Sequence, residues 1–562
     1  MVLLRRVGAI SGFTLVSRIL GLVRDTLMAW AFGASWVSGT FLLVWVFPNL
    51  MRRLLGEGAL SASFVPAYTA AHRKGGAEAS RLLMAQVIGT MLTWLVPLTL
   101  AVVALSLLVP AEWLAQSLET GMPGARLMLQ LNAVLFPYVV PICLTAIYSG
   151  ALNVLGSYGL PAAVPTVLNL FWIAALLLLG QVDPPWTLLA PDLAATGLML
   201  LPAGLGTTAA LAVPQLVHEA LTPVRDAAAA DGAVFLGWFL LAGGFAQVLV
   251  VLWPLRLAGA LAKPIGGFPP AGTPGRAVFV AMLPAILGMS ASQLSTLSDQ
   301  VLAYWFVSPG ANTYLYLANR LLLFPHALTA LSVAVAVFPK LAESATDTDR
   351  KGIRATLDTA TGATLLITLP AAVGLMVIGQ DLVEVLFQRQ RFTAEDADAT
   401  AITSICMVAG LPFIGLVQLY ARAFYAVGDN GVPARFAVRL LLVNFGLNLL
   451  LVPFLGFGTE AIAATSSLTS ALNALLLMRG VHRHCGSGHG IGMSWLRSLV
   501  ACAAMVGAIA WVRPEVGDDR MQMLVWRIAL PIAVGGAAYF ATHLLLRSPE
   551  LGAVRARLAR RG

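Results

Sequence analysis

The chain has 562 residues, of which 59% are hydrophobic and only 11% are charged, and its formal net charge at pH 7 is +9. Soluble domains carry about a quarter charged residues, so this composition excludes a soluble enzyme or binding module and indicates an integral membrane protein. The basic residues lie in short clusters beside apolar stretches rather than on one domain, which argues against nucleic acid as a partner.

Apolar stretches long enough to cross a hydrocarbon core of about 30 Å follow one another along the whole chain. Because a helix satisfies its backbone hydrogen bonds within one spanning segment, we predict an all-α integral membrane fold of about 14 transmembrane helices. In chain order, the predicted spans are residues 7–32, 36–62, 82–109, 126–152, 161–181, 235–260, 279–307, 312–340, 355–379, 397–427, 434–455, 459–478, 494–511 and 523–547.

Every second connection between these spans is rich in basic residues. Examples are "AHRKGGAEASR" after the second span, "TDTDRKGIR" after the eighth and "MRGVHRH" after the twelfth, and the C-terminal tail is basic as well. Arg5 and Arg6 precede the first span on the same side. Since basic connections stay on the cytoplasmic side of a membrane, we predict that both termini are cytoplasmic.

The two halves of the chain resemble each other at an offset of about 272 to 277 positions. The segment "LNVLGSYGLPA" (152–162) matches "FYAVGDNGVPA" (424–434), and the pairing of "RDTLMAWAFG" with "SDQVLAYWFV" sets Asp25 against Asp299. An even number of spans separates the copies, so both run in the same direction. We therefore predict two pseudo-symmetric lobes of about six helices each around a central cavity, followed by two C-terminal helices.

These observations divide the chain into three regions. We expect an N-lobe over residues 1–262, a C-lobe over 263–480, and two final helices with a basic cytoplasmic tail over 481–562. Residues 183–234 have no counterpart in the second half, and their Pro, Gly and Asp content predicts an outer hairpin or surface helices. Two further spans in this segment are the alternative.

Charged side chains lie inside the first two predicted spans. At about 100° per residue, Ser17, Arg18, Arg24 and Asp25 share one face of the first span. On the second span, one face carries Asn49, Arg52, Arg53 and Glu57. Each charge at a span centre costs about 2.5–3.5 kcal/mol on insertion scales, so these side chains must face water or one another.

Two interpretations of these charges remain. In the first, Arg24 or Arg18 pairs with Asp25 and Arg53 pairs with Glu57, and the salt bridges only orient helices. In the second, the arginines line a cavity that binds an anion, because they outnumber the acids. The arginines in question are Arg18, Arg24, Arg52, Arg53 and, in the second half, Arg320. The planar guanidinium fork suits phosphate oxygens, so the second interpretation predicts a phosphorylated substrate.

The second half carries an acid in the middle of a span. Asp299 lies in "SQLSTLSDQVLAYW", where an unpaired carboxylate is costly and usually functional. Asn444 and Asn448 are spaced i, i+4 on a later span, and Thr465 lies on the span after that. Their oxygens predict a site for a hard monovalent cation, with coupling to sodium or protons. The alternative is that Asp299 only forms hydrogen bonds with the two asparagines.

Three longer stretches resemble one protein family. They are "SRILGLVRDTLMAWAFGA", "FPNLMRRLLGEGALSASFVPAY" and "YLANRLLLFP". In these stretches the chain is similar to the MurJ/MviN family of lipid II flippases, in the MOP exporter superfamily that includes multidrug exporters of the MATE type. The resemblance covers essentially the whole chain except residues 183–234.

The resemblance implies a transporter and not an enzyme. Such a protein moves lipid II, the undecaprenyl-pyrophosphate-linked peptidoglycan precursor, from the cytoplasmic to the outer leaflet of the bacterial inner membrane by alternating access. The family's essential cavity arginines match Arg18, Arg24, Arg52 and Arg320, and its "EGA" glutamate matches Glu57. The expected substrate-binding residues are Ser17, Arg18, Arg24, Asn49, Arg52 and Arg320. The expected gating residues are Asp25, Arg53 and Glu57.

The sequence departs from the family pattern at two positions. Many relatives have an acid near the start of the second span, where this chain has Gly39, and they read "ADR" where this chain reads "ANR" with Asn319. Both changes remove negative charge around the expected cavity. They put the family's gating ion pairs in doubt and leave the anion site more positive.

Rival functions make different demands on the sequence. A cationic drug exporter needs net acid in its cavity, and a transporter of another polyprenyl-linked oligosaccharide would share the arginines. An integral-membrane enzyme acting on polyprenyl phosphates needs clustered acids with a metal or a His/Arg set, and the sequence has neither motif. We expect a monomer with no cofactor beyond sodium or protons, and with lipid II and membrane lipids as partners.

Overall fold

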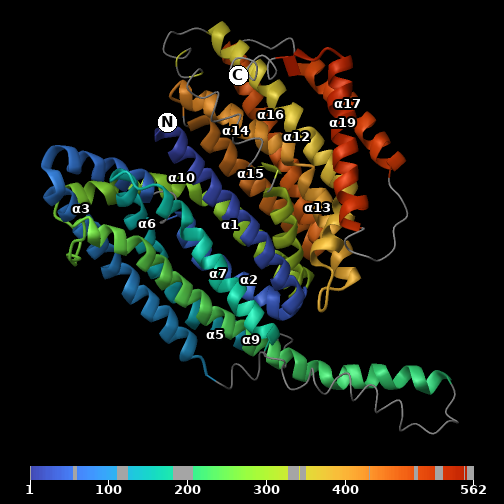
Figure 1. Ribbon diagram of the computed structural model, residues 1–562, viewed down its shortest axis with the longest axis horizontal. Coiled ribbons are helices and arrows are strands. Elements are labelled where there is room, and N and C mark those ends of the chain that lie inside the picture. Colours follow the sequence, from blue (N-terminus) through green and yellow to red (C-terminus); the bar gives the residue numbers. More distant parts are fainter. Residues whose placement is uncertain are drawn as a thin grey trace. The chain divides into compact units, whose positions relative to one another are not determined.

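Helices are the only regular secondary structure among the residues that the computed structural model describes (Figure 1). Among these residues, ten helices are long and apolar enough to cross a membrane. An α-helical membrane protein is therefore confirmed, and the total of about 14 spans stays a prediction. The described residues are 2–54, 60–110, 124–181, 207–323, 325–326, 341, 343, 350–429, 431–485, 491–512, 523–549 and 551–552.

The chain forms two compact units, Met1–Ser290 (unit 1) and Ala291–Gly562 (unit 2). The division falls inside helix α10 (Pro274–Leu302), later in the chain than the expected lobe boundary at residues 262 and 263. Helix α10 therefore contributes its N-terminal part to unit 1 and its C-terminal part to unit 2.

Unit 1 is built around three extensive helix contacts. Helix α1 packs along α7, which packs along α9, and α3 packs against α6 (Figure 1). One large cluster of buried apolar side chains, which includes Trp45, Tyr138 and Trp172, fills this unit. Its elements before α10 are α1 (Val2–Phe32), α2 (Trp36–Met51), α3 (Leu60–Leu107), α5 (Ala125–Leu135), η2 (Phe136–Tyr138), α6 (Val139–Val154), α7 (Gly159–Gln181) and α9 (Thr207–Leu257).

Unit 2 is built around the helices α16 and α12. Helices α13, α14 and α15 pack against α16, and the last two helices, α17 and α19, pack against each other and against α12. Residues 311–323 form a further helix. The other elements are η3 (Ala303–Val307), α12 (Arg350–Phe387), α13 (Ala394–Val408), α14 (Leu411–Ala426), α15 (Gly431–Leu449), η4 (Leu450–Phe454), α16 (Thr459–Cys485), α17 (Ile491–Val512), η5 (Met523–Ala529) and α19 (Leu530–Leu545).

Several predicted spans are not single regular helices, and three of them show the effect of proline. Prolines interrupt the backbone ladder because they lack the N–H group and their rings crowd the preceding turn. The span predicted at 126–152 contains the 3-10 turn Phe136–Tyr138, and the one predicted at 397–427 breaks before Pro412. The span predicted at 36–62 has Pro48 in α2, which ends at Met51. The boundaries predicted at 126–152 and 397–427 nevertheless agree with the span-length segments Ala125–Val154 and Ala394–Ala426 to within three residues.

One pair of glycines that the sequence repeat aligns has the same backbone conformation in both halves. Gly156 and Gly428, which the sequence pairs, both have positive φ, at 88° and 80°. The residue after each glycine donates its N–H to the carbonyl five residues before it, at 2.9 Å for Ser157 and 3.0 Å for Asp429. The same left-handed helix end therefore closes α6 in unit 1 and α14 in unit 2.

The segment at 183–234 is described only in part, because residues 182–206 lie outside the described ranges. From residue 207 onward the chain is helical and continues without interruption into the span-length part of α9, Ala228–Leu257. The segment is thus helical from that residue on, and its expected place on the outer side stays a prediction. The two further spans remain a prediction that no described residue tests.

The orientation of the chain can be tested with two exposed alanines. We expect single cysteines at Ala77→Cys and Ala394→Cys to react with a membrane-impermeant maleimide from opposite sides, because a basic connection carries the first and an acidic one the second. Labelling is measured in intact spheroplasts and in permeabilised ones. The parent for both is a variant without the four natural cysteines. Reaction of both positions from the same side would contradict the predicted topology.

Candidate functional site

Arg24 is the centre of the polar face of α1. Its side chain points into unit 1, where Arg24 is 7% exposed and Asp25 is 2% exposed. Arg24 Nε and Nη2 both donate to Asp25 Oδ1, at 2.9 and 2.7 Å. This is the pairing that the salt-bridge interpretation expects for these two residues, and it compensates a guanidinium that apolar helices otherwise surround.

Helix α7 supplies the other groups around Arg24. Arg24 Nη1 donates to Asn169 Oδ1 at 3.1 Å, and the guanidinium carbon lies 4.4 Å from the centroid of the Trp172 ring. Asn169 Nδ2 donates in turn to the backbone carbonyl of Ser17 at 2.9 Å, two helical turns before Arg24 on α1. Asn169 therefore holds both the arginine and the helix that carries it.

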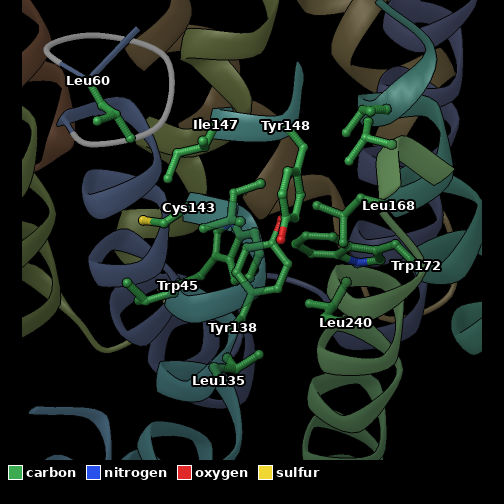
Figure 2. Close-up of a cluster of buried hydrophobic side chains, with 14 of the residues drawn as sticks. Trp45, Leu60, Leu135, Tyr138, Cys143, Ile147, Tyr148, Leu168, Trp172 and Leu240 are labelled. Carbon is green, nitrogen blue, oxygen red and sulfur yellow. The ribbon is translucent and has the colours of Figure 1, made fainter. Parts of the chain in front are cut away.

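An aromatic cluster supports the far side of Trp172. Its ring lies 5.2 Å from that of Trp45 and 5.7 Å from that of Phe41, both in edge-on contact. Trp45 also lies against Tyr138, whose hydroxyl donates to Gln247 Oε1 at 3.1 Å. Figure 2 shows Trp45, Tyr138 and Trp172 gathered in the buried cluster. Edge-on aromatic contacts restrict the orientation of each ring.

The second polar face begins at the end of α2. Arg52 Nη2 donates to Asn49 Oδ1 at 2.9 Å, and Arg52 Nε donates to the same oxygen at 3.3 Å. The structure thus brings together the two residues of α2 that the sequence assigns to substrate binding. Arg52 and Arg53 are half-buried. Glu57, the expected gating partner of Arg53, lies outside the described residues.

The remaining expected anion-binding residues differ in their surroundings. Arg18 is exposed and Ser17 is half-buried, and both lie about two helical turns before Arg24 on α1. Arg320 belongs to unit 2, where its Nη2 donates to the Tyr316 hydroxyl at 2.8 Å and its guanidinium lies 4.8 Å from the Tyr316 ring centroid. The convergence of these arginines on one anion stays a prediction.

The four residues of the expected cation site lie in one hydrogen-bonded group. Asn448 Nδ2 donates to Asp299 Oδ1 at 2.9 Å and contacts Asn444 Oδ1 at 3.3 Å. Thr465 donates its hydroxyl to Asn448 Oδ1 and also to the carbonyl of Ile462. The structure therefore joins α10, α15 and α16 at the residues that the sequence selects.

Sequence reasoning missed Asn169 and Trp172. Helix α7 is a nearly continuous apolar stretch, and Asn169 is an isolated amide in its middle. A buried amide in such a helix needs a polar partner, which is the signal that could have identified it. The sequence has no signal for Trp172, because a tryptophan in an apolar span is expected to be a packing residue.

Comparison with known proteins places this arrangement in a family. The family profile described as lipid II flippase MurJ matches residues 28–523. A Burkholderia cenocepacia protein named lipid II flippase MurJ is 30% identical over 526 residues, which cover 91% of this chain and 90% of that protein.

Two solved structures share the fold. The lipid II flippase MurJ in an inward closed conformation matches with a TM-score of 0.70 at 23% identity, over 96% of this chain and 98% of that one. An inward-facing MATE transporter of the MOP superfamily matches with a TM-score of 0.62 at 12% identity, over 84% and 94%. The family profile and the Burkholderia relative cover most of the chain, and we conclude that it belongs to the lipid II flippase MurJ family.

Proposed function

We propose that this chain moves lipid II from the cytoplasmic to the outer leaflet of the bacterial inner membrane by alternating access. The Burkholderia cenocepacia relative carries the name of that activity. The observation that carries the proposal is the setting of Arg24, a guanidinium at 7% exposure that is held among apolar helices by a carboxylate, an amide oxygen and an aromatic ring.

The Arg24–Asp25 pair suits exchange of one anion for another. A buried ion pair contributes little net stability, because desolvation of both charges offsets their attraction. Such a pair does keep the guanidinium charged and compensated while the carrier is empty. A pyrophosphate oxygen can accept from the same two nitrogens that now donate to Asp25, so lipid II can replace the carboxylate as the counter-charge of Arg24.

Further guanidinium groups complete the proposed anion site. Arg52, oriented by Asn49, supplies a second fork from α2. We assign the pyrophosphate to Arg18, Arg24, Arg52 and Arg320 together, and the gating role to Asp25, Arg53 and Glu57. A pyrophosphate carries several charges, so several arginines are needed to replace its water shell.

We also propose that a sodium ion or a proton couples to transport at Asp299. In unit 1 the carboxylate of Asp25 has a built-in cation, the guanidinium of the preceding residue. The residue that the repeat aligns with Arg24 is Ser298, whose hydroxyl donates to the carbonyls of Leu294 and Ser295 at 3.0 Å. A mobile cation would take the role that Arg24 has in the first half.

The two cations place different demands on the amide of Asn448. A protonated Asp299 can still accept from Asn448 Nδ2, so a proton fits the orientation present in this structure. Sodium needs oxygen ligands, so it requires the amide to turn its oxygen toward Asp299. Asn444 and Thr465 supply the neighbouring oxygens in either case.

The function is tested with the purified full chain in proteoliposomes. Lipid II that carries a fluorophore on its peptide is incorporated, and an impermeant reductant bleaches the outer leaflet. We expect the protein to expose most of the protected inner-leaflet fluorescence, and the lipid recovered afterwards to be chemically unchanged. Fluorescent phosphatidylglycerol is the control substrate and should stay protected.

Other outcomes of this experiment would identify the rival functions. A chemically altered lipid would indicate an enzyme, and equal exposure of phosphatidylglycerol would indicate an unselective scramblase. Transport of ethidium without transport of lipid II would indicate a drug exporter of the same superfamily. Each of these results contradicts the proposal.

A further inference from the structure

Helix α7 presents two side chains to Arg24 from one face. Asn169 and Trp172 are three residues apart, so they lie one above the other on the side of α7 that packs against α1. Asn169 contributes an oxygen to Nη1, and Trp172 contributes its aromatic face at 4.4 Å. We call this pair the α7 seat.

The α7 seat constrains Arg24 in ways that Asp25 alone does not. Arg24 Nε and Nη2 donate to one oxygen of Asp25, Oδ1, and neither of these bonds involves Nη1. The bond from Nη1 to Asn169 fixes the direction of the guanidinium, and the Trp172 ring opposes rotation of its plane. A long side chain that is already held in its binding orientation loses less conformational entropy when a ligand binds.

Neighbouring groups on α1 and α2 fix the two side chains of the α7 seat in turn. Trp172 is 1% exposed, and edge contacts with Trp45 and Phe41 of α2 fix its ring. Asn169 is fixed through its other end by the carbonyl of Ser17. Asn169 and Trp172 thus each contribute a contact that is specific to a guanidinium, a hydrogen-bond acceptor and an aromatic face.

We propose that Asn169 and Trp172 are positioning residues that orient the Arg24 guanidinium for the pyrophosphate of lipid II. This inference rests on the proposed function, since it concerns how the same site recognises its substrate. The two residues act through Arg24, so their contribution to lipid II affinity exists only while the arginine is present.

A double-mutant cycle tests this dependence. The Kd for lipid II is measured for the full chain in nanodiscs with Trp172→Leu and Asn169→Leu, each in the wild-type background and with Arg24→Ala. We expect each substitution to raise the Kd about tenfold in the wild-type background. In the Arg24→Ala background the same substitution should raise the Kd less than about twofold. Trp172→Phe keeps an aromatic face and should raise the Kd by less than about threefold.

A matched control separates positioning from packing. Leu176 is buried in the same cluster one turn further along α7. Leu176→Ala should lower the melting temperature without changing the Kd. Equal rises in Kd with and without Arg24, or an unchanged Kd for both seat variants, would overturn the inference. If Trp172→Leu does not fold, Trp172→Phe and Asn169→Leu carry the same comparison.

A measurement without lipid II keeps the two proposals distinguishable. Phenylglyoxal modifies guanidinium groups, and mass spectrometry reports its rate at Arg24. We expect Trp172→Leu and Asn169→Leu to accelerate modification of Arg24 at least about threefold, while Leu176→Ala leaves the rate unchanged. Absence of lipid II binding by the wild type would contradict the proposed function. An unchanged modification rate would contradict the seat, whatever the substrate is.

Discussion

Replacing Arg24 with alanine is expected to lower the rate of lipid II transport at least about 100-fold, and replacing it with lysine about tenfold. Lysine keeps the charge but has a single nitrogen. Arg24 uses three nitrogens, two toward Asp25 and one toward Asn169, and an ammonium group cannot reproduce that planar arrangement. Alanine additionally leaves Asp25 as a buried carboxylate without its cation.

The rates are measured with fluorescent lipid II in proteoliposomes and by growth of a strain that depends on the variant as its only flippase. Arg73→Ala is the control, because Arg73 is an exposed arginine in the same unit. Protein levels are matched by immunoblot. Normal transport and growth with Arg24→Ala would place the anion site elsewhere.

Replacing Asp299 with asparagine is expected to abolish the dependence of transport on a sodium gradient or on pH, with little change in lipid II affinity. The substitution keeps the shape of the side chain and its hydrogen bond with Asn448 but removes the only charge in that group of four residues. An uncharged amide cannot bind a proton at physiological pH, and it binds sodium weakly. The carrier then loses the bias that cation binding gives to one conformation.

Transport is measured with sodium gradients and pH gradients imposed separately, so that the responding cation is identified. Asp429→Asn is the matched control, because Asp429 is an exposed acid that caps the start of α15 and asparagine can keep the cap. If Asp299→Asn transports normally and responds to both gradients as the wild type does, Asp299 is a packing residue.

Helical periodicity explains why part of the site could be predicted. Arg24 and Asp25 were found because charges in an apolar helix are few and costly, and Asn444 and Asn448 because a spacing of four places them on one face. The same reasoning could not find Trp172. Its role depends on which helix packs against α1. Contacts between residues 145 positions apart, such as Arg24 and Asn169, leave no local pattern in the sequence.

The irregular turns inside the helices escaped prediction for a related reason. A hydropathy profile sees one apolar stretch from residue 126 to residue 152, although Pro137 imposes a 3-10 turn in its middle. Apolar side chains continue through the turn because both sides of it are in contact with the interior or with lipid. The interruption is a property of the backbone, and the profile records only side chains.

The left-handed turns at Gly156 and Gly428 also bear on the origin of the chain. Two halves that arise by duplication of one gene diverge first where many residue types are tolerated. A backbone with positive φ tolerates few besides glycine, so mutation at these turns is restricted in both copies. Next to the aligned acids Asp25 and Asp299 no such restriction applies, and one copy has arginine where the other has serine. A duplicated ancestor could in this way give its two descendants one frame and separate chemical tasks.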